Sequence, residues 1–127
     1  MIESKLVMNL YKQLIASTVH IFPTRGKINV SNNHGVYIIY SPEDEVLHVG
    51  MTPYGKKGLN QRLYNHISKT GIFYRKYLAP RAISLRDGYK FRFIEVENAR
   101  TRALLEALTA GQLCPAHFGT GQKVQNR

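Results

Sequence analysis

Two short apolar runs separated by turn-forming residues predict a β-hairpin near the middle of the chain. Apolar, largely β-branched residues fill 35–40 and 46–50, and the Ser-Pro-Glu-Asp-Glu segment between them is typical of turns. A four-residue loop over 41–44 would bring the two strands into antiparallel contact. We expect the rest of the chain to be organised around this hairpin.

The hairpin carries two reactive side chains, Tyr37 and His48. With a four-residue loop they would lie directly opposite each other, and Gly35 would lie opposite Gly50. Because side chains alternate along a strand, the phenol and the imidazole would share one face, and the glycines would leave room for a ligand. The pattern fits either an aromatic pair in a core or a reactive pair in a site.

Apolar residues at helical spacing predict three helices, over 3–17, 59–69 and 99 to about 111. Alternation over 89–96 predicts a third strand, and residues 72–86 predict a helix or irregular turns broken at a proline. The apolar helix positions are Leu6, Val7, Leu10, Leu14, Leu59, Leu63, Ile67, Leu104, Leu105 and Leu108.

This order of elements predicts an α/β protein of the α+β type. We expect a small antiparallel three-stranded sheet flanked by helices, with an extra N-terminal helix. The 127 residues, 43% of them hydrophobic, suffice for one core. We expect residues 1–32 to pack on the core as a helix and loop, 33–118 to form the main domain, and 119–127 to be a mobile tail.

Basic residues are concentrated in one third of the chain. The formal net charge is +10, and residues 54–92 hold ten basic residues against one acid, Asp87. Such a cluster is either a solvated surface or a face that binds a polyanion, and its concentration favours nucleic acid. The expected phosphate contacts are Lys56, Lys57, Lys69, Arg75, Lys76 and Arg81.

The cysteine content and the first residues bear on location. Cys114 is the only cysteine, so no internal disulfide can form, which fits a reducing, cytoplasmic compartment. Glu3 and Lys5 interrupt the apolar N-terminus, so we expect no signal peptide. No apolar run approaches the roughly 20 residues that span a bilayer, and we expect a soluble protein without a membrane partner.

Two predicted helices carry polar residues at positions that favour chemistry. Arg62 and His66 are four residues apart, so they share one helix face beside the apolar stripe. Glu106 has small neighbours, including Ala103 and Ala110, which leave space around its carboxylate. An exposed basic helix and a surface glutamate are the ordinary interpretations. A carboxylate with space around it is also a ligand that hard divalent ions favour.

Together these motifs resemble the signature of the GIY-YIG nucleases. The segments 35–37 (Gly-Val-Tyr) and 48–50 (His-Val-Gly) are similar to its two halves, and residues 33–118 hold the whole resemblance. The later matching positions are Arg62, His66, Glu106 and Pro115.

Two positions depart from the family pattern. His48 stands where the second signature tyrosine is expected, and a histidine can still form a hydrogen bond or move a proton. Phe118 stands where the family usually has an asparagine, and His117 or Asn126 is the candidate to replace it.

The resemblance implies a metal-dependent endonuclease acting on DNA, with RNA not excluded. Tyr37 would deprotonate or orient the attacking water, and His48 would hold Tyr37 or share its proton. Arg62 would clamp the scissile phosphate, and His66 would bind a phosphate oxygen or orient Arg62. Glu106 would hold Mg²⁺ or Mn²⁺. A domain of this size would read DNA structure, read sequence through its own loops, or form a homodimer that cuts two strands.

Two other functions are weighed against this one. The first is a nucleic-acid-binding module of the same fold that has lost catalysis, which the charge and Phe118 would explain. The second is a zinc or thiol site at Cys114 and His117, and one cysteine with scattered histidines is a poor ligand set for it.

Overall fold

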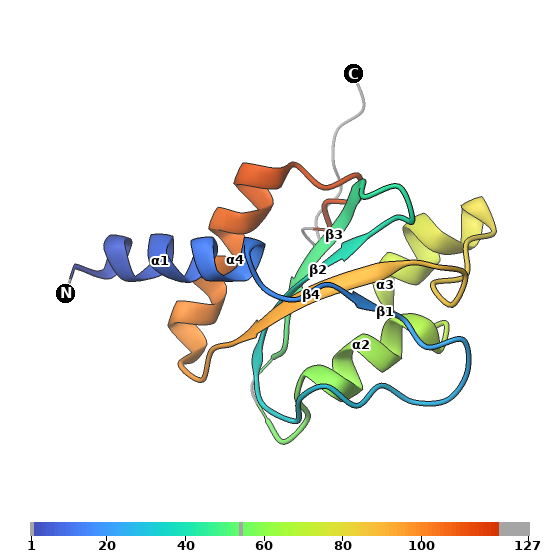
Figure 1. Ribbon diagram of the computed structural model, residues 1–127, viewed down its shortest axis with the longest axis horizontal. Helices are drawn as coiled ribbons and strands as arrows, with labels where there is room; N and C mark the ends of the chain where they lie inside the picture. The colour runs from blue at the N-terminus through green and yellow to red at the C-terminus, as the bar shows by residue number, and fades with distance from the viewer. Residues whose placement is uncertain (1, 54, 120–127) are drawn as a thin grey trace.

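The computed structural model describes residues 2–53 and 55–119, which form one mixed helix and sheet fold (Figure 1). The predicted tail beyond residue 119, with Asn126, lies outside the described residues. The elements in chain order are α1 (Glu3–Ile15), β1 (His20–Ile21), β2 (Gly35–Tyr40), β3 (Val46–Met51), α2 (Leu59–Ile67), α3 (Gly71–Phe73), the π-helical turn η1 (Tyr74–Leu78), the 3₁₀ turn η2 (Ala79–Arg81), β4 (Lys90–Glu95) and α4 (Ala99–Leu113).

The sheet is antiparallel, with strand order β1-β4-β2-β3. The predicted α+β class, with helices flanking the sheet and an additional N-terminal helix, is confirmed. The prediction of three strands is wrong by one, because β1 adds to the edge of β4. In that pair His20 lies opposite Phe91 and Ile21 opposite Lys90. Two residues are too few for a periodic signal, so this strand could not be recognised from the sequence.

The register of the central hairpin differs from the prediction. Tyr37 lies opposite Gly50 and Ile39 opposite His48, so the predicted pairing is shifted by two residues. The loop has three residues, because Ser41 donates its backbone N–H to the Glu45 carbonyl at 2.8 Å. The last residue of the loop, Asp44, adopts the left-handed region (φ 70°), which is the usual geometry of a three-residue hairpin loop.

A β-bulge supplies the rest of the shift. The register changes between Ile39, opposite His48, and Tyr40, opposite Val46, which leaves Leu47 as an extra residue on β3. An even shift does not change which face a side chain occupies. Tyr37 and His48 therefore share one face, as predicted, although they are diagonal neighbours with ring centroids 6.1 Å apart.

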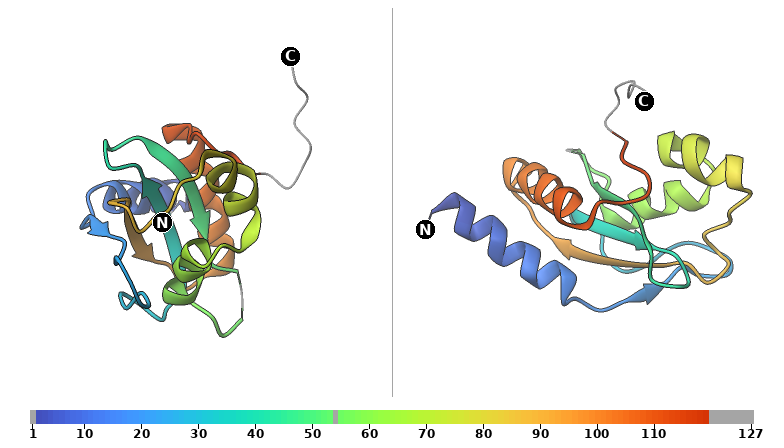
Figure 2. Two further views of the ribbon diagram at one scale, coloured as in Figure 1. Left: turned by 90° about the vertical axis from the view of Figure 1, so that its right-hand side faces the viewer. Right: turned by 90° about the horizontal axis from the view of Figure 1, so that it is seen from above.

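Each face of the sheet has its own core. Helices α2 and α3 cover one face, and α1 and α4 cover the other; Figures 1 and 2 show the two pairs at different ends of the twisted sheet. The first core includes Tyr37, Ile39, Leu47, Leu59, Leu63, Phe73 and Phe91. The second includes Val7, Leu14, Val36, Ile38, Val49, Val96 and Leu105.

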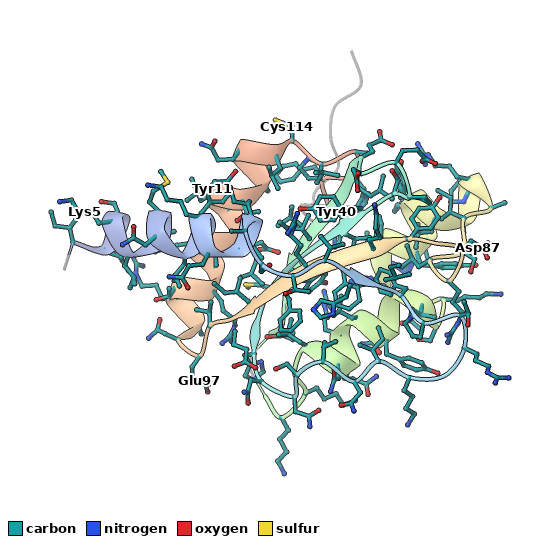
Figure 3. The ribbon with its side chains drawn as sticks, in the orientation of Figure 1. Lys5, Tyr11, Tyr40, Asp87, Glu97 and Cys114 are labelled. Atoms are coloured by element: carbon teal, nitrogen blue, oxygen red, sulfur yellow. The ribbon has the colours of Figure 1, made fainter. Side chains whose placement is uncertain are left out.

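The buried stripe of the N-terminal helix differs from the expected one at one position. Val7 and Leu14 are buried, whereas Leu6 is 37% exposed and lies outside the packed stripe. Tyr11 of α1 and Tyr40 of β2 pack against the same second core, in the region labelled in Figure 3. Among the described residues, no helix combines the length and apolar composition needed to cross a membrane.

Candidate active site

A pocket of about 440 Å³ lies where β3, α2, α3 and α4 meet. Four of the predicted site residues line it: His48 from β3, Arg62 and His66 from α2, and Glu106 from α4. Tyr37 is fully buried behind this wall. The pocket therefore brings together side chains from distant parts of the chain, since His48 and Glu106 are 58 residues apart.

Tyr37 and His66 form the closest polar contact of the site. The Tyr37 hydroxyl lies 2.6 Å from His66 Nε2, and both side chains are buried. Burial raises the pKa of Tyr37 to about 12, against the opposing effect of the Arg62 charge. Burial, aided by Arg62, lowers the pKa of His66 to about 3. At neutral pH this is a hydrogen bond between an uncharged phenol and an uncharged imidazole.

A glycine makes room for the phenol. Gly50 lies opposite Tyr37, and a Cβ atom at Gly50 would overlap the Tyr37 hydroxyl. Because Gly50 also lines the pocket, the hydroxyl lies directly behind the pocket wall. This second signature glycine is therefore explained by the position of Tyr37, a contact that the predicted register did not contain.

His48 packs within a cluster of rings. It stacks on Phe73 with centroids 4.4 Å apart and meets the edge of the His66 ring at 5.2 Å. Burial, together with the charges of His66, His117 and Arg62, lowers the pKa of His48 well below its ordinary value. In the structure the ring nitrogen that contacts the Tyr37 hydroxyl belongs to His66 on the neighbouring helix, and the role expected of His48 stays a prediction.

Arg62 and Glu106 have polar atoms available to a ligand. Arg62 Nε is buried without a hydrogen-bond partner. Glu106 is half-buried, and within the described residues its carboxylate has no hydrogen bond or salt bridge. Burial raises the pKa of Glu106, and the positive charge of Arg62 opposes that shift. Within the same described residues, no three His, Cys, Asp or Glu side chains group around one point to hold a metal ion.

His117 joins the pocket from beyond the last helix. The left-handed Cys114 (φ 48°), labelled in Figure 3, ends α4, and the chain turns back towards β3. Ala116 and His117 then donate backbone hydrogen bonds to the carbonyls of Val46 (3.0 Å) and Leu47 (2.9 Å). We call residues 114–117 the strap.

The strap brings the His117 ring into the aromatic cluster. Its centroid is 5.5 Å from that of His48, and its Nε2 is buried without a partner. Burial and the charge of Arg81 lower the pKa of His117. The neighbouring Phe118 is 62% exposed. The substitution of asparagine by Phe118 was the sequence signal that pointed to this histidine.

The basic side chains predicted to contact nucleic acid differ in whether they also contact another side chain of the protein. Lys56, Lys57, Lys69, Arg75 and Lys76 are exposed. Arg81 is exposed too, but its guanidinium lies 3.9 Å over the Tyr77 ring.

Three further cations of 54–92 have partners within the fold. Arg86 donates to the Pro23 and Gly26 carbonyls, Lys90 pairs with Asp44, and Arg92 donates to the Ser17 carbonyl. The free positive charge is therefore smaller than the count of basic residues suggested.

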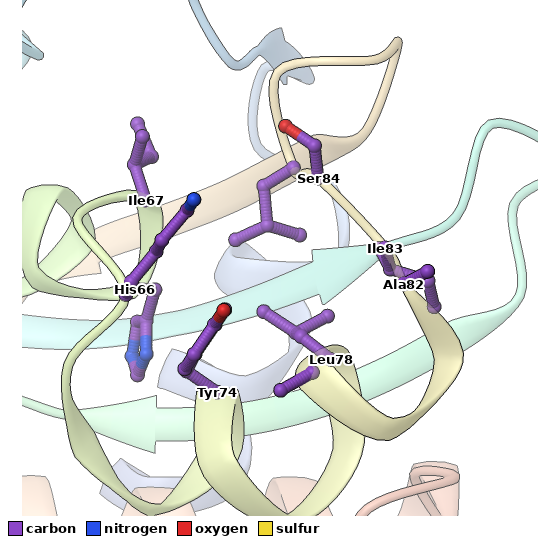
Figure 4. A pocket seen from close by; sticks show the side chains of 10 residues that line it. His66, Ile67, Tyr74, Leu78, Ala82, Ile83 and Ser84 are labelled. Carbon is purple, nitrogen blue, oxygen red and sulfur yellow. The ribbon is translucent and has the colours of Figure 1, made fainter.

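A smaller hollow lies on the other side of His66, with a volume of about 240 Å³ (Figure 4). Tyr74, Leu78 and Ile83 line it, and Lys69 lies at this hollow and not among the residues lining the larger pocket. His66 thus separates two cavities, and its Nδ1 is buried without a partner.

Comparison with known proteins agrees with this geometry. The family model described as the GIY-YIG catalytic domain matches residues 33–113, well over half of the chain. No curated protein matches the chain. The matched segment contains Tyr37, Arg62, His66 and Glu106 and ends before His117.

Proposed function

This chain belongs to the GIY-YIG catalytic domain family of nucleases, and from that premise we propose that it is a divalent-metal-dependent endonuclease that hydrolyses phosphodiester bonds of DNA. The observation that carries the proposal is the convergence of Arg62, His66 and Glu106 on one pocket, with Tyr37 hydrogen-bonded behind it. Hydrolysis needs an activated water and a positive environment for the phosphate, and these residue types supply both.

Tyr37 and His66 would act on the attacking water as a pair. A phenol with a pKa of about 12 is not a phenolate at neutral pH. Its oxygen can nevertheless accept a proton from water while it passes its own proton to His66 Nε2 along their 2.6 Å hydrogen bond. This arrangement requires a neutral His66, which its lowered pKa supplies, and a negative phosphate in the pocket would raise that pKa as the ring takes the proton. His48 would position the His66 ring through their edge contact, with the ring centroids 5.2 Å apart.

Arg62 would bind the scissile phosphate. Its guanidinium is charged at every relevant pH and forms paired hydrogen bonds with two phosphate oxygens. The partnerless Nε at the pocket supports this role, because a buried donor without an acceptor is costly unless a ligand supplies one.

The residues present fit a single divalent cation. A half-buried carboxylate without a protein partner, its pKa raised by burial, is stabilised by a positive ion. Glu106 would hold Mg²⁺ or Mn²⁺ as the one protein ligand, with water and phosphate oxygens completing the shell, as is common for Mg²⁺. When bound, the ion would neutralise charge that develops on the phosphate and the leaving oxygen.

The exposed lysines and arginines would bind neighbouring phosphates of the DNA. Lys56 and Lys57 lie in the loop between β3 and α2, and Arg75 and Lys76 lie on η1. Along the chain both groups adjoin elements that form the pocket, so DNA bound there could reach this positive charge.

The full burial of Tyr37 favours one alternative, a DNA-binding module of the same fold without nuclease activity. Incubating the protein with supercoiled plasmid and Mg²⁺ separates the two functions. We expect nicked or linear product, lost in EDTA. Glu106→Gln should reduce cleavage to background while DNA affinity is kept. Binding without product at any Mg²⁺ or Mn²⁺ concentration would establish the module instead, and normal cleavage by Glu106→Gln would refute the metal assignment.

A further inference from the structure

Ile72 is an unusual surface residue for this domain. Its side chain is 46% exposed, and it is the one exposed large hydrophobic residue among the described positions of 33–113. The others lie in the first 21 residues or at Phe118. An isolated apolar side chain on a surface is ordinary, but this one lies at a pocket that we assign to substrate.

The packing of the neighbouring residue holds Ile72 in place at the pocket. It lines the larger pocket, and Gly71 before it adopts the left-handed region (φ 90°), which turns the chain into α3. The next residue, Phe73, is 2% exposed and stacks on His48. Phe73 thus anchors the segment in the site, while the neighbouring Ile72 side chain lines the pocket. The anchor removes much of the flexibility that would otherwise weaken a contact made by Ile72.

The residues beyond Ile72 suggest what it meets. Arg75 and Lys76, three and four positions on, are exposed on the π-helical turn and suited to phosphates. An aliphatic side chain near such cations has no favourable contact with a phosphate. The largest apolar surfaces of DNA are the faces of its bases, and these are covered by stacking in a regular duplex. An aliphatic residue beside backbone contacts is the arrangement by which proteins unstack and kink a base step.

We propose that Ile72 packs against an unstacked base next to the scissile phosphate, so that the preferred substrate is duplex DNA with an unpaired or easily kinked step at the cut. This inference rests on the proposed function, because it takes DNA as the substrate. A regular duplex must first be unstacked at that step, whereas a bulged or mismatched duplex is already open.

The test measures binding without cleavage. Two duplexes carry 2-aminopurine beside the expected contact; they share one sequence, except that one strand of the second holds a single extra, unpaired base. Titrations with the full chain in EDTA give affinity and base unstacking together. We expect wild type to bind the bulged duplex about tenfold more tightly and to increase its fluorescence, and Ile72→Ala to lose about tenfold on that duplex, the effect of about two buried methylene groups.

Two variants serve as controls. Ile72→Leu keeps the aliphatic volume and should retain the preference. Ile21→Ala removes a similar side chain that is 67% exposed on β1 and should leave both affinities unchanged. Thermal unfolding of each variant confirms that the exposed substitutions leave the fold intact.

The outcomes distinguish this inference from the proposed function. Equal affinity of wild type for the two duplexes, or an unchanged preference in Ile72→Ala, overturns the inference even if plasmid is cleaved. A preference that depends on Ile72, in a protein that cleaves nothing with Mg²⁺, supports the inference and overturns the nuclease. Failure to bind either duplex overturns both.

Discussion

The two faces of the sheet bury different chemistry. The face covered by α1 and α4 has a largely aliphatic core around Ile38 and Leu105, whereas the face covered by α2 and α3 also buries the polar rings of Tyr37 and His66. Of five buried side-chain polar atoms without a partner in the described residues, four belong to pocket residues: His48, Arg62, His66 and His117. Unused hydrogen-bonding capacity is thus concentrated where a ligand can use it.

Two arginines, one on each side of the sheet, show the same difference in hydrogen bonding. Arg102 of α4 is 2% exposed, and its guanidinium donates to the carbonyls of Thr52, Val96 and Glu97 at 2.7–3.1 Å. Arg62 of α2 keeps a buried Nε without an acceptor. A buried arginine whose donors are paired with carbonyls joins strand ends to a helix. A buried arginine donor without an acceptor is available to an anion. Changes on the two sides should therefore separate stability from activity.

The largest effect is expected from the hydroxyl of Tyr37. Tyr37→Phe keeps the ring in its core and removes only the group that accepts the water proton. Single-turnover cleavage should slow by about 10²–10⁴-fold, the usual range for a general base. DNA binding should be unchanged. The loss of one buried hydrogen bond should lower the free energy of unfolding by about 1–2 kcal/mol. A wild-type rate would assign Tyr37 to packing and remove the chemical distinction between the faces.

The arginine pair tests the comparison directly. Arg102→Ala leaves three carbonyls without a donor and should cost about 3–5 kcal/mol in the free energy of unfolding, with cleavage retained per folded molecule at low temperature. Arg62→Ala should do the reverse and slow cleavage by about 10²–10³-fold, with little loss of stability. Urea unfolding and cleavage assays on both proteins provide the measurement. Equal stability losses would contradict the contrast.

Lowering the pH should destabilise the face of the sheet that carries the pocket. The unfolded His66 has an ordinary pKa of 6.5, and the folded one about 3, so between these values the unfolded chain binds a proton that the folded chain does not. The free energy of unfolding should fall as pH falls, by about 2 kcal/mol between pH 6.5 and pH 5 for this ring. Burial lowers the pKa of His48 as well, which adds in the same direction.

A variant isolates this contribution. Glu106, whose pKa is raised, acts in the opposite direction on acidification, so the wild-type curve contains both effects. His66→Gln should flatten the decline seen in urea midpoints at pH 7, 6 and 5. An unchanged slope would show that His66 titrates normally in the folded protein.

The smallest effect concerns charge on the loop after β3. Reversing Lys56 and Lys57 to glutamate should weaken binding of many DNA sequences alike by about tenfold or more, and should reduce the dependence of log affinity on log salt. The matched control reverses Lys5 and Lys12, which are exposed on α1. Equal losses from the two double variants would mean that positive charge anywhere on the domain suffices.

The sequence could predict most of the elements and the face that each site residue occupies. Period-two alternation survives an even slip in register, so Tyr37 and His48 were placed on one face despite the wrong pairing. Helical spacing likewise placed Arg62 beside His66. The bulge at Leu47 was not predictable, because nothing in an apolar run marks which residue is unpaired.

Contacts between distant elements were beyond sequence reasoning. The distance from His66 Nε2 to the Tyr37 hydroxyl depends on how α2 packs on the sheet, and no spacing in the chain encodes it. The burial of Arg102 is similar, because its acceptors are backbone carbonyls at strand ends, which every residue carries. The contacts of His48 and His66 therefore could not be derived from the sequence.

The strap at 114–117 has a consequence for assembly. β3 is an edge strand, and the exposed carbonyls of such an edge can pair with a strand of another molecule. Here Val46 and Leu47 already accept hydrogen bonds from the strap. The opposite edge, β1, offers only two residues. A strand of a second molecule could therefore pair with the start of β3 only by displacing the strap, which protects this part of the edge from pairing between molecules.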